Sequence, residues 1–174
     1  MKKLSHEEIS AGRAKLEYID KIQRMPLVCV IDSIRSMYNT GSIFRTSDGA
    51  LIEKLILTGY TPTPEKKEVL KTALGACDSI PWEYIKDPVE AVRMLKQTGY
   101  TDKKRIYTKV QPQEFPLALV IGNEITGVSQ RVLDECDLAL EIPQYGIKQS
   151  LNVAVAYGVA LFELRRVYDL TGEK

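Results

Sequence analysis

The sequence predicts a single α/β domain in which helices flank a mainly parallel sheet. Strand-like and helix-like segments alternate along nearly all of the 174 residues, which is the pattern of a parallel sheet with crossover helices. The length suits one domain with a full core, and 44% of the residues are hydrophobic. No linker, repeat or low-complexity stretch breaks the alternation. Residues 1–174 are therefore treated as one unit.

The chain opens with a predicted amphipathic helix over residues 5–24, the core of an N-terminal helical arm. Ser5 with Glu8 three positions later fits a capping box, and the helix must end before Pro26. Residues 27–31 form a continuous apolar run rich in β-branched side chains, which is typical of a strand buried on both faces. The next predicted elements are a polar loop, a helix over 42–50, a strand over 54–58 and a helix over 65–74.

The second half continues the same alternation. A short strand is predicted over 82–85, and Asp87, Pro88 and Glu90 supply the cap, first-position proline and capping partner of a helix that runs to about residue 98. The remaining predicted elements are strands over 105–110, 117–121 and 138–142, a short helix from Ser129 to Cys136, and a long final helix over 151–168.

The final helix is apolar on two sides. One side carries Leu151, Val155, Val159 and Phe162, and the other carries Val153, Tyr157, Leu161 and Leu164. A helix that is apolar on two faces is buried on two faces. We expect one face to meet the sheet and the other to meet a second subunit.

Composition excludes several classes of protein. No apolar run reaches the ~18 residues of a membrane span, and the N-terminus lacks the apolar middle of a secretory signal, so we expect a cytoplasmic protein without membrane contact. His6 is the only histidine, and three scattered cysteines form no CxxC pair, which argues against a metal site. A net charge of +1 means that RNA binding needs local patches. The candidates are residues 96–109 and the N-terminal arm, unless these are ordinary solvated cations.

Three polar, glycine-bearing clusters follow predicted strands, at the edge where open α/β sheets bind ligands. The first contains Asn39, Gly41 and Arg45, and the second contains Gly122 and Glu124. The third covers residues 142–152, with Ser150 predicted as a helix cap and Asn152 inside the first helical turn. Neither GxGxxG nor GxxxxGK[ST] is present. The residues alone indicate a nucleotide-like ligand site, and simple tight turns remain the alternative.

Three segments resemble the ordered motifs of SpoU (TrmH-like) methyltransferases of the SPOUT superfamily: NTGSIFRTSDGA, LVIGNEITGVS and IPQYGIKQSLNVAVAYGVALFE. KTALGACDSIPWEY, over residues 71–84, is similar to the segment between the first two motifs. The resemblance covers about residues 27–166. It implies a C-terminal trefoil knot, a homodimer, and S-adenosylmethionine bent in the knot. The cofactor-binding residues that it implies are Thr108, Gly122, Ile142 and Leu151.

The same resemblance implies transfer of a methyl group to an RNA ribose 2′-hydroxyl, without a metal. The residues implied around the reaction centre are Asn39, Arg45, Glu124, Ser150 and Asn152. A guanidinium stays charged in proteins, so we expect Arg45 to clamp a phosphate and stabilise the developing alkoxide, while Asn39 or Ser150 orients the hydroxyl. Gln144, Ala154 and a short stretch over 99–116 depart from the family pattern.

Three functional interpretations follow. The first is an enzyme that acts on tRNA, with rRNA as the alternative substrate. The second is a catalytically idle SPOUT protein that binds RNA. The third, a generic small-ligand domain, accounts for the loops but not for the ordered motifs.

Overall fold

The computed structural model describes residue 5 and residues 16–96, 104–147 and 150–172. The first described element is a 3-10 helix, η1 (Leu16–Lys21). The α-helix predicted over 5–24 is therefore wrong at its C-terminal end, where the chain is 3-10 and stops at Lys21. Residues 6–15 of that prediction lie outside the described residues.

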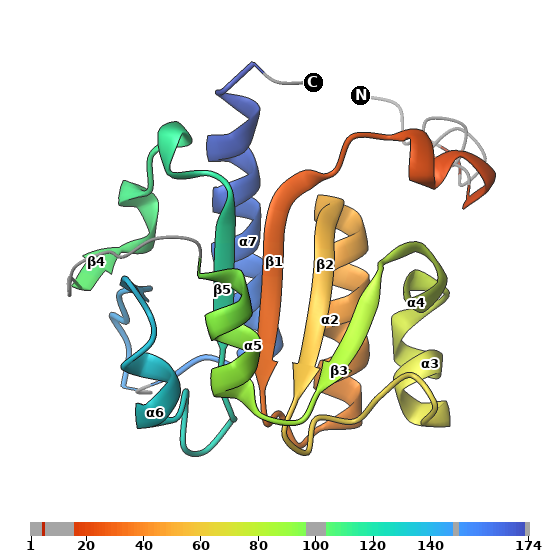
Figure 1. The fold of residues 1–174 in the computed structure, drawn as a ribbon, viewed down its shortest axis with the longest axis horizontal. Helices are drawn as coiled ribbons and strands as arrows, with labels where there is room; N and C mark the ends of the chain where they lie inside the picture. The colour runs from red at the N-terminus through yellow and green to blue at the C-terminus, as the bar shows by residue number, and fades with distance from the viewer. Residues whose placement is uncertain (1–4, 6–15, 97–103, 148–149, 173–174) are drawn as a thin grey trace.

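Two parallel sheets form the scaffold, and every ladder between named strands is parallel (Figure 1). The larger sheet has the order β3-β2-β1-β5, with β1 (Met25–Asp32) and β2 (Ile52–Thr58) in the middle. β3 (Trp82–Ile85) and β5 (Leu117–Ile121) form its edges. The smaller sheet pairs β4 (Lys104–Ile106) with β6 (Ala139–Glu141). The predicted α/β fold with a parallel sheet is confirmed, but it is divided into two sheets.

Helices cover both faces of the larger sheet (Figure 1). On one face lie α2 (Met37–Ala50) and α7 (Val153–Asp169), which contact each other. On the other face lies α5 (Pro88–Leu95), with α6 (Gln130–Leu133) beside it. α3 (Lys67–Ala73) and α4 (Ala76–Ser79) pack on α2 at the outer side.

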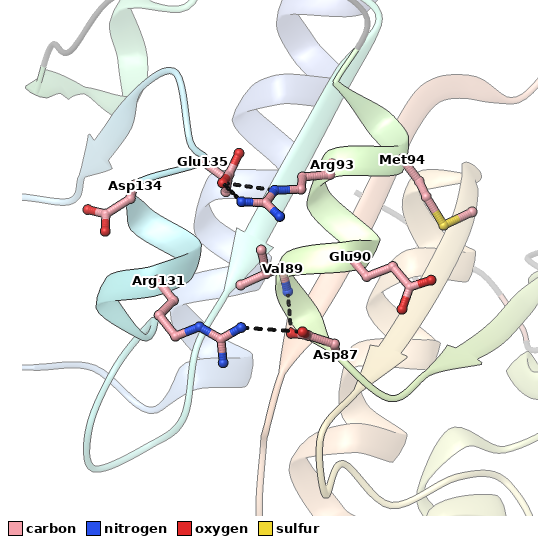
Figure 2. A pocket seen from close by; sticks show the side chains of 8 residues that line it. All are labelled: Asp87, Val89, Glu90, Arg93, Met94, Arg131, Asp134 and Glu135. Atoms are coloured by element: carbon pink, nitrogen blue, oxygen red, sulfur yellow. Dashed lines mark hydrogen bonds and ion pairs between the residues drawn. The ribbon is translucent and has the colours of Figure 1, made fainter.

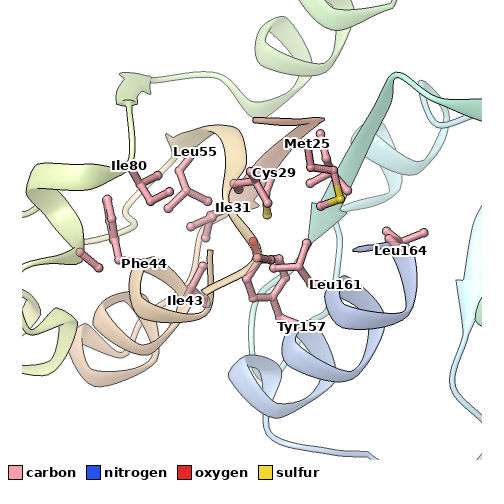
Figure 3. Packing of buried hydrophobic residues seen from close by; sticks show 14 of the residues in the cluster. Met25, Cys29, Ile31, Ile43, Phe44, Leu55, Ile80, Tyr157, Leu161 and Leu164 are labelled. Carbon is pink, nitrogen blue, oxygen red and sulfur yellow. The ribbon is translucent and has the colours of Figure 1, made fainter. Parts of the chain in front are cut away.

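The main core fills the space between β1, β2, α2 and α7 (Figure 3). Met25, Ile31, Phe44 and Leu161 are each fully buried there, and burial of such a side chain contributes about 1.5–3 kcal/mol. A smaller cluster around Val30, Ile56 and Val92 lies under α5 on the opposite face. Both faces of β1 are therefore buried, as its continuous apolar run predicts.

The two apolar sides of α7 have different environments. Tyr157, Leu161 and Leu164 are buried against the sheet, and the Tyr157 hydroxyl lies 2.7 Å from Ser47 Oγ. Val155, Val159 and Phe162 on the second side remain 38–53% exposed. One apolar face therefore meets the sheet, as predicted, and the other face remains partly exposed in the described structure.

The cysteines are free, as expected of small core residues. Cys29 is fully buried, and burial raises the pKa of its thiol far above the ordinary value. Burial also raises the pKa of Cys77, to about 11, with a smaller contribution from Asp78. Both thiols are therefore protonated and unreactive at neutral pH.

Several predicted boundaries are wrong for local reasons. α2 begins at Met37 rather than 42, because the Ser36 hydroxyl accepts a hydrogen bond from Asn39 N at 3.2 Å and caps the helix there. The strand predicted over 105–110 ends at Ile106 and continues as the 3-10 helix η2 (Tyr107–Lys109). The one-turn helix α4 was not predicted. Within the described residues, no helix is both long enough and apolar enough to cross a membrane.

Candidate functional site at the carboxyl edge of the sheet

The carboxyl ends of β1, β2, β3 and β5 lie side by side at the bottom of Figure 1. We call this end of the larger sheet its carboxyl edge. β1 leads through residues 33–36 into α2, and β5 leads through residues 122–129 into α6. The two loops are tied together, because the buried Asp32 carboxylate accepts a hydrogen bond from Ser129 N at 3.1 Å. The parallel topology thus brings the first two predicted clusters to the same place.

Glu124 joins the second cluster to the first. One carboxylate oxygen accepts from Arg35 N at 3.0 Å. The other accepts from Ser36 N at 3.1 Å and from Asn39 Nδ2 at 2.9 Å. A single carboxylate therefore fixes both the turn before α2 and a side chain in the first turn of that helix.

Asn39 joins the first cluster to the third. Its carbonyl oxygen accepts a hydrogen bond from Asn152 Nδ2 at 3.1 Å. The Asn152 carbonyl oxygen in turn accepts from Ala154 N at 2.9 Å and Val155 N at 3.4 Å, so Asn152 is the N-cap of α7. Ser150 was predicted as that cap, and this was wrong: Ser150 lies two residues earlier, and Asn152 directly precedes the first helical residue, so its side chain is the one next to the free helical amides.

The charge of Glu124 is stabilised by these contacts. Partial burial raises the pKa of its carboxyl group, but the hydrogen bonds from Arg35 N, the Asn39 amide and Ser36 N outweigh burial. The net pKa lies below the ordinary value of 4.5. Glu124 is therefore an anion at neutral pH that accepts hydrogen bonds, which makes it a poor proton donor.

The side chains of Arg45 and Ser150 are exposed and have no partner among the described residues. Arg45 lies in the third turn of α2, and its guanidinium makes no hydrogen bond or ion pair with any described residue. The Ser150 side chain likewise has no partner in the part of the chain that the structure describes. Of the five predicted reaction-centre residues, the structure joins Asn39, Glu124 and Asn152 by hydrogen bonds and leaves these two available to a ligand.

The four predicted cofactor residues lie in separate segments. Thr108 is exposed in η2, Ile142 is half-buried after β6, and Leu151 is 40% exposed before α7. Gly122 follows β5, where an added Cβ would collide with backbone atoms of Gly127 and Val128. The fold of its own loop therefore requires a glycine at this position, independently of any contact with a cofactor.

Sequence reasoning missed Asn123 and Tyr60. The Asn123 side chain is buried, and its amide donates to Ser33 O and to the Tyr60 hydroxyl, each at 2.8 Å. Its carbonyl oxygen accepts from Ile125 N at 2.8 Å and Thr126 N at 3.0 Å. Asparagine between a strand end and a glycine is a signal for this kind of turn, in which the side chain bonds backbone amides two residues on.

Much of the positive charge in the predicted RNA-binding patches serves the fold. Lys96 bonds Glu135 O at 3.1 Å, and Arg105 forms an ion pair with Glu114 at 2.6 Å. Arg24 donates to backbone oxygens of Ile52 and Ser79. Other members lie outside the described residues or have undescribed side chains: Lys2, Lys3, Arg13, Lys15, Lys103 and Lys104.

A groove of about 530 Å³ lies elsewhere, between α5 and α6 (Figure 2). Ion pairs from Arg93 to Glu135 at 2.5 Å and from Arg131 to Asp87 at 3.4 Å cross it. None of the predicted site residues lines this groove. Its floor and walls are occupied by side chains that bond one another, so we place the candidate site at the hydrogen-bonded clusters instead.

An open parallel sheet with three polar loops joined at its carboxyl edge defines an α/β protein that binds a nucleotide-like ligand at that edge. The sequence narrows this class further. The model of the SpoU rRNA Methylase family matches residues 26–162, and the chain belongs to this family of RNA methyltransferases.

Similar proteins come from several bacteria. A 23S rRNA (guanosine-2′-O-)-methyltransferase of Ralstonia nicotianae is 31% identical over 155 residues, which are 86% of this chain and 62% of that protein. The crystal structure of an A. aeolicus TrmH/SpoU tRNA modifying enzyme aligns with a TM-score of 0.78 at 26% identity, covering 90% of this chain and 84% of that one. An AdoMet-bound rRNA methyltransferase from Sinorhizobium meliloti aligns with a TM-score of 0.75 at 29% identity, covering 85% and 59%.

Proposed function

We propose that this protein transfers the methyl group of S-adenosylmethionine to a ribose 2′-hydroxyl of RNA, and that the RNA is a tRNA. The observation that carries the proposal is the Asn39 amide, which bonds Glu124 on one side and Asn152 on the other. This bridge gathers the three motif segments at one edge of the sheet. The ordered motif set favours this enzyme over a generic small-ligand domain.

The proposed reaction needs positioning more than acid–base chemistry. The 2′-oxygen forms a bond to the methyl carbon, the carbon–sulfur bond breaks, S-adenosylhomocysteine leaves, and the hydroxyl proton passes to solvent. Holding the two reacting atoms in line supplies much of the rate. Asn39, Glu124 and Asn152 are occupied by one another, so in this proposal they position the loops. Arg45 and Ser150, which have free polar atoms, contact the RNA.

The residues around the third cluster suit an adenosine-type cofactor. In residues 143–147, no backbone amide or carbonyl makes a hydrogen bond within the described structure. Tyr145 and Ile147 are 95% and 100% exposed. A loop with free backbone donors and acceptors beside apolar side chains fits a purine ring and its ribose. When bound, S-adenosylmethionine supplies the electrophilic methyl group. Related structures with AdoMet bound, from Sinorhizobium meliloti and Streptomyces viridochromogenes, support this cofactor.

One observation supports tRNA over rRNA: the A. aeolicus tRNA modifying enzyme aligns over 90% of this chain with a TM-score of 0.78, against 85% and 0.75 for the Sinorhizobium rRNA enzyme. Methylation at the ribose is supported by the 2′-O specificity of the Ralstonia relative.

The exposed apolar face of α7, with Val155, Val159 and Phe162, supports a homodimer. We also propose a single domain with the knotted C-terminal topology of the superfamily.

The test is transfer of labelled methyl groups to total tRNA and, separately, to rRNA by the wild type and by Arg45→Ala, followed by nucleoside analysis. We expect a 2′-O-methylnucleoside in tRNA and a loss of at least about hundredfold in the variant, because a planar cation that stabilises developing charge is removed. Arg45→Lys should also lose activity, since it lacks the two-pronged geometry. Transfer to rRNA alone would correct the substrate, and no transfer to any RNA would favour the idle interpretation.

A further inference from the structure

Two exposed tyrosines stand at the carboxyl edge, outside the predicted site residues. Tyr60 follows β2 directly and is 60% exposed, and Tyr84 in β3 is 46% exposed. The Tyr84 hydroxyl donates to Gly59 O, so both side chains are attached to the same turn. Most large aromatic side chains lose contact with water on folding. Two that keep wide exposure at one turn suggest a role outside the core.

The ring of Tyr60 is held in place by its hydroxyl group. This oxygen accepts a hydrogen bond from Asn123 Nδ2 at 2.8 Å, and the Asn123 side chain is itself buried. The next residue, Glu124, bonds Asn39. Tyr60 is therefore connected to the Asn39 bridge through a short and rigid path. A ring that is fixed before binding loses little conformational entropy when a flat partner stacks on it.

Two cations at this edge are available to a ligand. Arg35 and Lys86 are exposed, and their side chains form no ion pair with any described residue. Arg35 lies beside Glu124, and Lys86 O accepts a hydrogen bond from Gly59 N, so both flank the tyrosines. The neighbouring carboxylates are engaged: Glu124 accepts three hydrogen bonds, and Asp87 accepts from Val89 N and Arg131.

We propose that Tyr60 and Tyr84, with Arg35 and Lys86, form a platform for single-stranded RNA, on which bases next to the methylated nucleotide stack. Exposed aromatic faces with unpaired cations match the bases and phosphates of an unpaired strand. The platform also accounts for how a protein with a net charge of +1 holds RNA when Lys96, Arg105 and Arg24 serve the fold. This inference rests on the proposed function.

The experiment measures equilibrium binding of the methylated RNA at about 50 and about 200 mM salt. Tyr60→Leu should weaken binding roughly tenfold or more at both salt concentrations, because base stacking carries no charge. Tyr60→Phe keeps the ring but loses the hydroxyl that fixes it, so its binding should weaken clearly less than that of Tyr60→Leu. Lys86→Ala should reduce the slope of the salt dependence of binding by about the contribution of one phosphate contact. Met94→Ala, at a 64% exposed apolar residue of α5 outside this edge and outside both predicted RNA-binding patches, is the control.

Cofactor affinity and melting temperature are measured for each variant. RNA containing 5-iodouridine is also irradiated in complex with the wild type. This part of the test does not depend on whether a variant folds. We expect a cross-link in the tryptic peptide 55–66, which contains Tyr60. Tyr60→Leu that binds RNA like the wild type, Tyr60→Phe as weak as Tyr60→Leu, or a missing cross-link would each overturn the platform. In that case we would assign this surface to the binding of a protein partner.

The same RNA is assayed for methylation by the wild type, which separates the two failures. If the wild type methylates RNA and Tyr60→Leu binds it normally, the platform is wrong and the proposed function stands. If the wild type neither binds nor methylates any RNA, the proposed function fails and the platform fails with it.

Discussion

Asn39 is suited to its position because the two ends of an amide differ. Its nitrogen faces the Glu124 carboxylate and its oxygen faces the Asn152 nitrogen. Aspartate would set two carboxylates against each other, and leucine would leave Glu124 with one donor fewer. A neutral side chain that both donates and accepts is required between an anion and an amide. The chemistry of this one residue thus joins the third loop to the first two.

Glu124→Gln tests whether the carboxylate positions the turn before α2. The substitution replaces an acceptor by an NH₂ group that must face Arg35 N or Ser36 N. We expect kcat/KM for RNA methylation to fall roughly ten- to hundredfold, because small displacements of the reacting groups are costly. The site is exposed, so the loss in free energy of unfolding at pH 7 should be at most about 1 kcal/mol after solvent screening.

The pH dependence of stability provides the matched check on Glu124. Its folded-state pKa lies below the ordinary value of 4.5, so the ionised form contributes stability that is present above pH 4.5 and is lost as the pH falls through the folded-state pKa. In urea unfolding, the difference in free energy of unfolding between the wild type and Glu124→Gln should therefore shrink as the pH falls through this range. A difference that grows toward acidic pH would contradict the assigned hydrogen bonds.

At the scale of elements, the sequence predicts the strands best. β3 and β5 have the predicted bounds of 82–85 and 117–121, because polar or proline residues on either side of a short apolar run leave little choice of where the strand begins and ends. Helix starts were less predictable. α2 begins at Met37 rather than at the predicted residue 42, and Asn152 rather than the predicted Ser150 caps α7. The contact that connects Asn39 to Asn152 spans 113 residues, so no local pattern could predict it.

Asn152 has two functions that substitutions can separate. Asn152→Asp keeps an oxygen for Ala154 N and Val155 N and adds negative charge at the start of α7, where the helix dipole favours it. It removes the amide that donates to Asn39. We expect the free energy of unfolding to stay within about 0.5 kcal/mol of the wild type while methyl transfer falls.

Asn152→Ala is the companion variant, since it removes both the cap and the bridge. It should lower the free energy of unfolding by about 1 kcal/mol and lower methyl transfer as well. Urea unfolding and single-turnover methylation of the same preparations measure the two effects. Full activity in Asn152→Asp would show that the bond to Asn39 does not matter for the reaction.

For the whole molecule, the unequal exposure of α7 is the main unexplained feature of the described surface. One side of the helix forms the core with β1 and α2, while Val155, Val159 and Phe162 line the other side. The Phe162 ring lies next to Gly49 of α2. An exposed apolar strip of this kind on a folded protein marks an interface, and a second copy of the chain is the occupant that we propose.

Sedimentation or light scattering at micromolar concentration tests this interface. We expect the wild type to have twice the mass of the 19.6 kDa chain. Val155→Asp should be monomeric, because a carboxylate would be buried without a partner in the apolar interface, yet the 53% exposure of Val155 in the single chain means that the fold itself should tolerate the charge. Leu70→Asp introduces the same charge at a 46% exposed aliphatic residue of α3 and should remain dimeric. A monomeric wild type, or a dimeric Val155→Asp, would show that the exposed side of α7 has another role.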